Sequence, residues 1–188
     1  MALTQLDPNT ALIIVDLQKG LMGAPFLHPI GDVVARSCAL ADRFRTLGLP
    51  VVLVNVAGTA PGRTEQPPRH AKPLPPEWIE LIPELDRQPD DIVVTKRTWG
   101  AFASTDLAAR LKARDVTQVV ITGVATGTGV ESTARQAYEQ GFNVTLAIDA
   151  MTDARAEAHD YSIGKIFPRL GETGTSTEII DLLNRRSA

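Results

Sequence analysis

The chain has 188 residues, which fits one domain, and we treat residues 1–188 as a single domain. Its 44% hydrophobic and 22% charged residues are ordinary for a globular protein and exclude a disordered chain. With 19 Lys and Arg against 22 Asp and Glu, the formal net charge is −3, so neither nucleic acid nor an anionic membrane is an expected partner. A small-molecule ligand fits this charge better.

No apolar run approaches the ~20 residues of a membrane span, and the first ten residues carry no basic segment of an export signal. A lone cysteine, Cys38, excludes an internal disulfide and is compatible with a reducing compartment. We therefore expect a cytoplasmic protein without membrane contact.

Short β-branched runs alternate with segments of helical periodicity, which is typical of βαβ units around a parallel sheet. Strands are predicted at residues 11–16, 50–56, 91–95, 116–122, 142–148 and near 173. Helices are predicted at residues 31–47, 77–81, 105–113, 130–140, 153–166 and 177–184, with Ser104 as the N-cap of the third. Residues 57–76 contain six prolines and two glycines, which predicts a structured loop or lid. The expected fold is a doubly wound α/β/α sandwich, with its ligand at the carboxyl ends of the strands.

Three ionisable residues follow or end predicted strands: Asp16, Lys96 and Asp149. Acids at such positions also cap the next helix or turn, and a lysine there is often solvated. A functional role is favoured for Asp16 and Lys96 as a pair, because both are expected at the mouth of the same pocket. If they lie within a few Å, each favours the charged form of the other.

A glycine-rich turn, Gly123–Gly129, leads from the strand predicted at residues 116–122 into the helix predicted at residues 130–140. Such a turn can aim backbone N–H groups, here those around Thr128 and Gly129, at an anion or a developing oxyanion. It is neither a P-loop nor a dinucleotide fingerprint, because the spacing and the following residues differ. The alternative is a tight connection that needs small residues for packing.

Three sequence motifs, in this order, resemble those of the isochorismatase-like hydrolase superfamily, which includes nicotinamidases and cysteine hydrolases. They are Val15-Asp16-Leu17-Gln18, Thr95-Lys96-Arg97 with Ala101-Phe102, and Thr122-Gly123-Val124-Ala125-Thr126 followed by Val130-Glu131-Ser132-Thr133. The resemblance covers about residues 10–182. It implies a six-stranded parallel sheet of order 3-2-1-4-5-6, a homo-oligomer (dimer or tetramer) and no cofactor.

Matching the family's catalytic Asp, Lys and Cys to this chain gives Asp16, Lys96 and Gly129. Glycine has no nucleophile, so a thioester mechanism is impossible at that position. The resemblance then points to the branch without the thiol, which cleaves a vinyl ether with water. Ala125-Thr126-Gly127 stands where those isochorismatases have Tyr-Ala-His, and Gly58-Thr59 where they have Gln-Pro, which argues against isochorismate itself as substrate.

Several residues at the same edge are expected to bind substrate or line its pocket. They are Gln18, Phe26, Trp99, Phe102, Val124, Ala125 and Thr128, with a family cis peptide implied at Val124–Ala125. The aromatic residues have the alternative of covering the end of the core, and Thr126, Thr128 and Ser132 that of capping the turn. Arg63 and Arg69 either meet a substrate carboxylate or are solvated.

No metal is expected, because Asn55-Val56-Ala57 replaces the Asp-x-His of the nicotinamidase branch, and His28, His70 and His159 are scattered along the chain. The sequence leaves three functions open. The first is a hydrolase that acts on a small enol ether or related acid with water. The others are a catalytically silent binding or regulatory protein and an amidase that uses Cys38.

Overall fold

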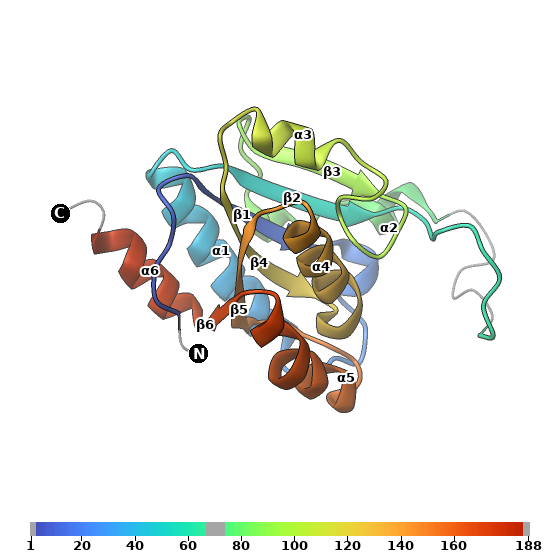
Figure 1. Cartoon of the computed structure of the whole chain (residues 1–188). Coiled ribbons are helices and arrows are strands. Elements are labelled where there is room, and N and C mark those ends of the chain that lie inside the picture. The colour runs from blue at the N-terminus through green and yellow to red at the C-terminus, as the bar shows by residue number, and fades with distance from the viewer. Residues whose placement is uncertain (1–2, 67–73, 186–188) are drawn as a thin grey trace.

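The computed structural model describes residues 3–66 and 74–185, which contain a six-stranded parallel sheet of order β3-β2-β1-β4-β5-β6 (Figure 1). The strands are β1 (Thr10–Val15), β2 (Val51–Val56), β3 (Ile92–Lys96), β4 (Gln118–Val124), β5 (Asn143–Thr152) and β6 (Glu172–Gly174). All five neighbouring pairs are parallel. The predicted fold class and strand order are confirmed.

Helices cover both faces of the sheet and make three layers (Figure 1). They are α1 (Ile30–Thr46), α2 (Pro76–Ile79), α3 (Leu107–Lys112), α4 (Glu131–Glu139), α5 (Ala156–Tyr161) and α6 (Ser176–Arg185). Short helical turns follow β1, α2 and β4 as η1 (Lys19–Leu21), η2 (Pro83–Leu85) and η3 (Thr126–Val130), and follow α5 as η4 (Ser162–Ile166) and η5 (Phe167–Arg169). One buried cluster joins the sheet to α1 and α6, and the other joins it to α3 and α4.

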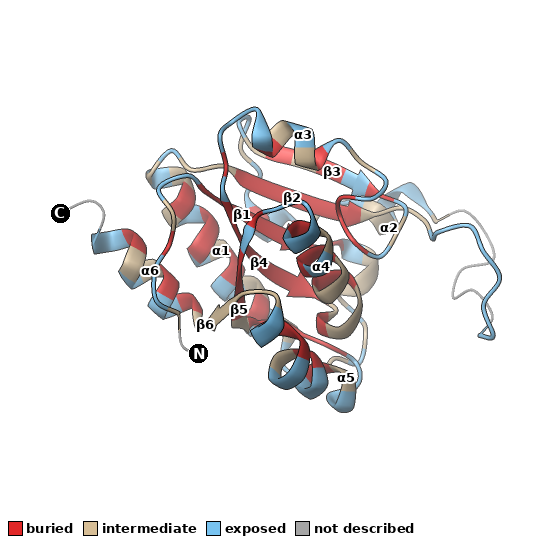
Figure 2. Cartoon of the chain, in the orientation of Figure 1, coloured by how far each residue is buried: buried red, intermediate tan, exposed pale blue. Residues whose placement is uncertain are grey.

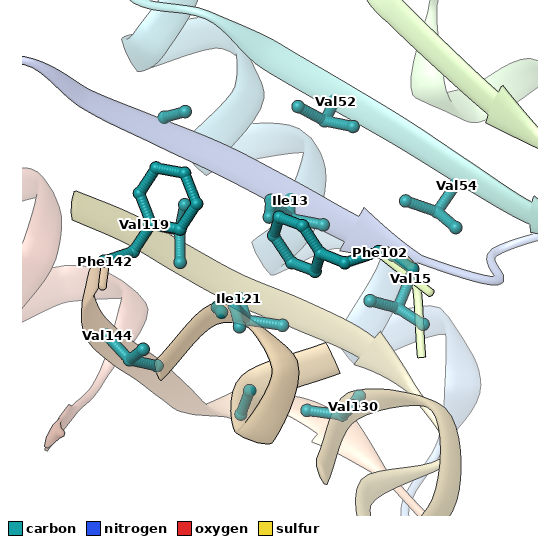
Figure 3. Close-up of a cluster of buried hydrophobic side chains, with 14 of the residues drawn as sticks. Ile13, Val15, Val52, Val54, Phe102, Val119, Ile121, Val130, Phe142 and Val144 are labelled. Carbon is teal, nitrogen blue, oxygen red and sulfur yellow. The ribbon is translucent and has the colours of Figure 1, made fainter. Parts of the chain in front are cut away.

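Strand β1 lies at the centre of the sheet and is buried on both faces (Figure 2). Ile13 and Val15 belong to the cluster under α3 and α4, which Figure 3 shows, whereas Leu12 and Ile14 belong to the cluster under α1 and α6. This division follows from the two-residue period of a strand. The continuous apolar run of β1 is therefore explained by helices on both sides.

Gly123, near the end of β4, shows why a glycine is needed beside β1. Its φ is +108°, and a Cβ there would lie 2.1 Å from the carbonyl oxygen of Val15. Any other residue would be strained and would push the two central strands apart. The glycine thus lets the turn after β4 start close to the end of β1.

The amphipathic helix predicted at 31–47 is confirmed as α1. Its buried residues include Val33, Leu40 and Phe44, and Gly48 follows the helix with a φ of +67°. None of the helices in the described ranges combines the length and hydropathy that crossing a bilayer requires.

Two details of the prediction are wrong. Ser104 does not cap α3: its Oγ accepts the N–H of Arg97 at 3.1 Å, and Thr105 Oγ1 accepts the N–H of Leu107 instead. The fifth strand does not end before Asp149 but continues to Thr152 after a register shift against β4. Asp149 therefore lies within β5, where its carboxylate accepts the N–H and hydroxyl of Ser176 at the start of α6.

Candidate active site

Asp16 and Lys96 form a buried ion pair at the carboxyl end of the sheet. Lys96 Nζ donates to Asp16 Oδ2 at 2.7 Å, and the two side chains are 2% and 6% exposed. Strand β2 lies between their strands, a separation of roughly 10 Å at ~4.8 Å per strand. The extended lysine side chain closes this gap, so the two residues that the sequence put at one pocket mouth are in contact.

The backbone at Asp16 explains how its side chain reaches this position. Its φ is +56°, a left-handed conformation that aspartate tolerates better than most residues. The N–H of Asp16 donates to the carbonyl of Val54 at 2.9 Å, and its carbonyl accepts the N–H of Gln18 at 2.9 Å. The chain thus turns sharply after β1 while it stays hydrogen-bonded to β2.

The Lys96 ammonium has further acceptors in the loop after β3. It donates to the carbonyl oxygen of Trp99 at 2.9 Å and lies 3.4 Å from that of Thr98. An ammonium group has three donors, and this loop together with Asp16 satisfies them. Lys96 is thereby fixed in place and holds the loop that carries Trp99.

Burial dominates the electrostatics of Asp16. It raises the pKa of Asp16 to about 6, although the charge and hydrogen bond of Lys96 act in the opposite direction. Asp16 Oδ1 is buried and has no hydrogen-bond partner. Asp16 therefore has one oxygen bound to Lys96 and one free oxygen, with a pKa suited to proton transfer near neutral pH.

Gly129 lies against this pair, in the turn η3. A Cβ on Gly129 would be 3.1 Å from Asp16 Oδ2 and 2.9 Å from the carbonyl oxygen of Val124. A side chain at 129 would therefore start beside the Asp16 carboxylate. The Val124–Ala125 peptide that begins the turn is cis, as the resemblance implied.

The Thr128 N–H, one of the donors expected to bind an anion, is hydrogen-bonded within the turn. That N–H donates to the carbonyl of Ala125 at 3.0 Å, and the N–H of Val130 donates to the same oxygen at 3.1 Å. Thr128 and Ala125 are half-buried, whereas Val124 is buried. The turn satisfies these donors itself, so its tight internal hydrogen bonding corresponds to the alternative interpretation.

The side-chain amide of Gln18 is hydrogen-bonded to backbone groups through both its nitrogen and its oxygen, so it is not free to bind a substrate. Its Nε2 donates to the carbonyls of Val56 and Trp78, both at 3.1 Å, and its Oε1 accepts the N–H of Val56 at 2.7 Å. The side chain is fully buried. Gln18 instead joins the end of β1 to β2 and α2.

The three predicted aromatic residues have different surroundings. Phe102 belongs to the core with Ile13 and Val15 (Figure 3), so it covers the end of the core. Phe26 is half-buried against the cluster under α1. Trp99 is 64% exposed, although its carbonyl is bound to the buried lysine. Phe26 and Trp99 remain candidates for contact with a ligand.

The side chains of His28 and His159 lie close together, with ring centroids 4.8 Å apart. His159 Nδ1 lies 2.9 Å from the hydroxyl of Thr126, and Asp153, just beyond β5, accepts the N–H of Gly127 at 2.8 Å. These two histidines are therefore far apart in the sequence but neighbours in the fold. Because the residues come from separate segments, only the strand order predicted from the sequence could have suggested their proximity.

Other expected groups lie elsewhere. Arg63 is exposed, and Arg69 and His70 lie outside the described residues. In residues 3–66 and 74–185, no three His, Cys, Asp or Glu side chains gather as a metal site would require. Cys38 lies on α1, where its thiol donates to the carbonyl of Glu84 at 3.1 Å.

A surface pocket of ≈ 370 Å³ lies at the opposite edge of the sheet, where β4 and β5 begin. Gln118, Asn143 and Tyr138 are among the residues that line it. None of the predicted site residues lines this pocket.

A family model described as the isochorismatase domain matches residues 10–178. The chain belongs to the isochorismatase family. It is 42% identical over 183 residues to the isochorismatase family protein YecD of Escherichia coli O157:H7, covering 93% of this chain and 96% of that protein.

The solved structure of an isochorismatase family protein from Burkholderia thailandensis matches with a TM-score of 0.91 and 40% identity, covering 96% of this chain and 98% of that one. Nicotinamidase 3 of Arabidopsis thaliana is 36% identical over 177 residues, covering 84% of this chain and 81% of that protein. Because its relatives in the isochorismatase family are hydrolases, this chain is a hydrolase.

Proposed function

We propose that this hydrolase cleaves a small enol ether or a related small acid with water, and that Asp16 transfers the proton. The observation that carries the proposal is the buried Asp16–Lys96 pair beside Gly129, where the family's cysteine enzymes have their nucleophile. With no thiol at 129, a covalent thioester cannot form there. An acid of raised pKa in a poorly hydrated site is the group that enol ether hydrolysis needs.

The proposed reaction begins with proton transfer from Asp16 Oδ1 to the terminal carbon of the enol ether double bond. The resulting oxocarbenium ion takes up water, and the proton that water loses returns to the Asp16 carboxylate. The hemiketal then collapses to a ketone and an alcohol, so that one water is consumed and no other reactant is needed. The hydrogen bond from Lys96 stabilises the carboxylate that forms when Asp16 gives up its proton.

The proposed contacts for the substrate are Phe26, Trp99, Ala125 and Thr128. Trp99 is exposed and the other three are half-buried, so a ligand can reach all four. Gln18 and Phe102 are not among these contacts, because Gln18 is hydrogen-bonded to the backbone and Phe102 is buried in the core. The amidase that uses Cys38 is not favoured either, because its thiol contacts η2 and burial raises the pKa of that thiol.

The test is turnover of a panel of enol ethers, amides and carboxylic acids by the wild type and by Asp16→Asn, followed by mass spectrometry in ¹⁸O-labelled water. We expect label in the carbonyl product of an enol ether and loss of turnover in Asp16→Asn, with folding retained. Unchanged turnover in that variant would refute the role of Asp16. Thermal stabilisation by a panel member without any product would instead support the silent binding protein.

A further inference from the structure

A second polar cluster lies beside the turn η3, on the side away from Lys96. Thr126 Oγ1 and His159 Nδ1 are 2.9 Å apart, and Thr126 is fully buried while His159 is 6% exposed. The histidine belongs to α5, which packs against η3 near the carboxyl end of the sheet (Figure 1). A buried hydrogen bond of this kind fixes the position of both groups, because breaking it leaves an unpaired polar atom.

The cluster extends to the loop between β1 and α1. The His28 ring lies 4.8 Å from that of His159, and Thr152 Oγ1 accepts the N–H of His28 at 3.1 Å and lies 3.2 Å from its Nδ1. Thr152 is the last residue of β5 and pairs with Val124. The end of β5 therefore supports the loop that carries Phe26.

Asp153 ties the same two segments together through the backbone. Its carboxylate Oδ2 accepts the N–H of Gly127 at 2.8 Å, and its carbonyl accepts the N–H of Leu27 at 2.8 Å. One residue after β5 thus holds both η3 and the loop of residues 22–29. These are the segments that supply Gly129 and Phe26 to the candidate site.

Burial, together with the neighbouring His28, lowers the pKa of His159, whereas Asp160 and Asp153 oppose this. A neutral imidazole can accept the hydroxyl proton of Thr126 at Nδ1. The electrostatics therefore agree with a hydrogen bond that persists at neutral pH.

From this geometry we infer that Thr126, His159 and His28 are positioning residues, which hold η3 against Asp16, tie the loop 22–29 to the same segment and keep water from the carboxyl group of Asp16. The inference rests on the proposed function of Asp16 as the proton-transferring group. Its physical basis is the contact of η3 with Asp16: a Cβ on Gly129 would be 3.1 Å from Oδ2. If η3 moved away, the carboxyl group would be hydrated and would ionise at lower pH.

The experiment uses the full-length chain and needs no substrate. Thr126→Val removes the hydroxyl at nearly constant volume, and Thr126→Ser restores it. The matched control is Thr145→Val, because Thr145 is also fully buried and its hydroxyl accepts one hydrogen bond, from Gln118 Nε2 at 3.0 Å, at the other edge of the sheet. The carboxyl titration of Asp16 is followed by ¹³C NMR, and amide exchange of residues 124–130 and 22–29 by hydrogen–deuterium exchange.

In Thr126→Val we expect the pKa of Asp16 to move down by about one unit and the amides of Gly127, Thr128 and Val130 to exchange about tenfold faster, the effect of losing one buried hydrogen bond. Thr126→Ser should restore both values, and Thr145→Val should change neither. His159→Phe should reproduce the Thr126→Val result, and it replaces that variant if the latter does not fold.

An Asp16 pKa that is unchanged in both Thr126→Val and His159→Phe would overturn the inference, as would an equal downward shift in Thr145→Val. Because neither readout depends on turnover, the outcome is separate from that of the proposed function. Loss of the Asp16 role would appear as turnover in Asp16→Asn, with the positioning result unaffected.

Discussion

The proton on Asp16 should make the stability of this protein depend on pH in an unusual direction. A buried carboxyl group whose pKa is raised binds its proton more tightly in the folded chain than in the unfolded one. Its contribution to stability is complete below the ordinary value of 3.8 and is lost as the pH rises through about 6. The free energy of unfolding assigned to Asp16 should therefore fall between pH 4 and pH 6.5, whereas most ion-paired acids give a rise.

The magnitude follows from the size of the pKa change. From 3.8 to about 6 is a change of about two pH units. Each unit corresponds to about 1.4 kcal/mol, so the loss is ~3 kcal/mol. No reduction for solvent screening is needed, since the Asp16 side chain is only 6% exposed.

The assay is denaturant unfolding of the wild type and of Asp16→Asn at intervals from pH 3.5 to 7.5. Subtracting the variant from the wild type cancels the other titrating groups and leaves the contribution of Asp16. Glu172→Gln gives a comparison of opposite sign: burial raises the pKa of Glu172, but hydrogen bonds from Thr4 outweigh it and lower the pKa. The contribution of Glu172 to the free energy of unfolding should be present above its ordinary pKa of 4.5 and should be lost as the pH falls below that value.

A wild-type minus Asp16→Asn difference that stays level, or that grows from pH 4 to pH 6.5, would refute the reasoning. A level difference would mean that Lys96 compensates the burial of Asp16 completely. A growing difference would mean that the ion pair outweighs burial and that Asp16 is ionised well below pH 6. In both cases Asp16 could not hold a proton near neutral pH.

Four further predictions concern Asp16, Lys96, Gly129 and Cys38. With a turned-over substrate, the rate limited by protonation should fall as the pH rises through about 6, and a rate that rises there would make Asp16 a base. Lys96→Met should cost about 3–5 kcal/mol in denaturant unfolding at pH 7.5, where it leaves a buried carboxylate unpaired, and clearly less at pH 5. Gly129→Ala should lose about 1–3 kcal/mol because its Cβ meets the Val124 carbonyl, while Gly164→Ala, with open space around it, should stay within ±0.5 kcal/mol; equal losses would contradict the contact. Cys38→Ala and thiol alkylation should leave turnover unchanged, and a loss in both would restore the thiol mechanism.

The fold was predictable because its elements have strong local patterns. The continuous apolar run of β1 reflects burial on both faces of the strand. The three- and four-residue spacing of apolar residues in α1 reflects burial of one face of the helix. The strand order came from the family resemblance, since no local pattern determines which strands are neighbours. Asp149 misled the prediction because an acid after an apolar run resembles a strand end, whereas here it caps α6 from within β5.

The candidate site was predictable in part. Asp16 and Lys96 lie at the ends of strands, so their common edge follows from the parallel sheet. The hydrogen bonds of Gln18 and of the Thr128 N–H were not predictable, because both depend on carbonyl groups that turns bring into range. The same is true of the contact of His28 with His159, which joins residues 131 positions apart.

Gly129 and the raised pKa of Asp16 are physically consistent with each other. A carboxylate that takes the proton from a thiol must be ionised, whereas a carboxyl group that donates a proton must be protonated. A pKa of about 6 makes Asp16 protonated over a wider pH range than an ordinary aspartate. In the proposed reaction Asp16 acts in its protonated form, and the glycine at 129 leaves unfilled a position 2.9 Å from the carbonyl oxygen of Val124 that a Cβ would take. A Gly129→Cys variant would then introduce a Cβ 2.9 Å from that carbonyl oxygen and would have to displace the turn before its sulfur could react. A thiol at 129 would therefore require the turn η3 to shift, and the hydrogen bond between Thr126 and His159 opposes such a shift.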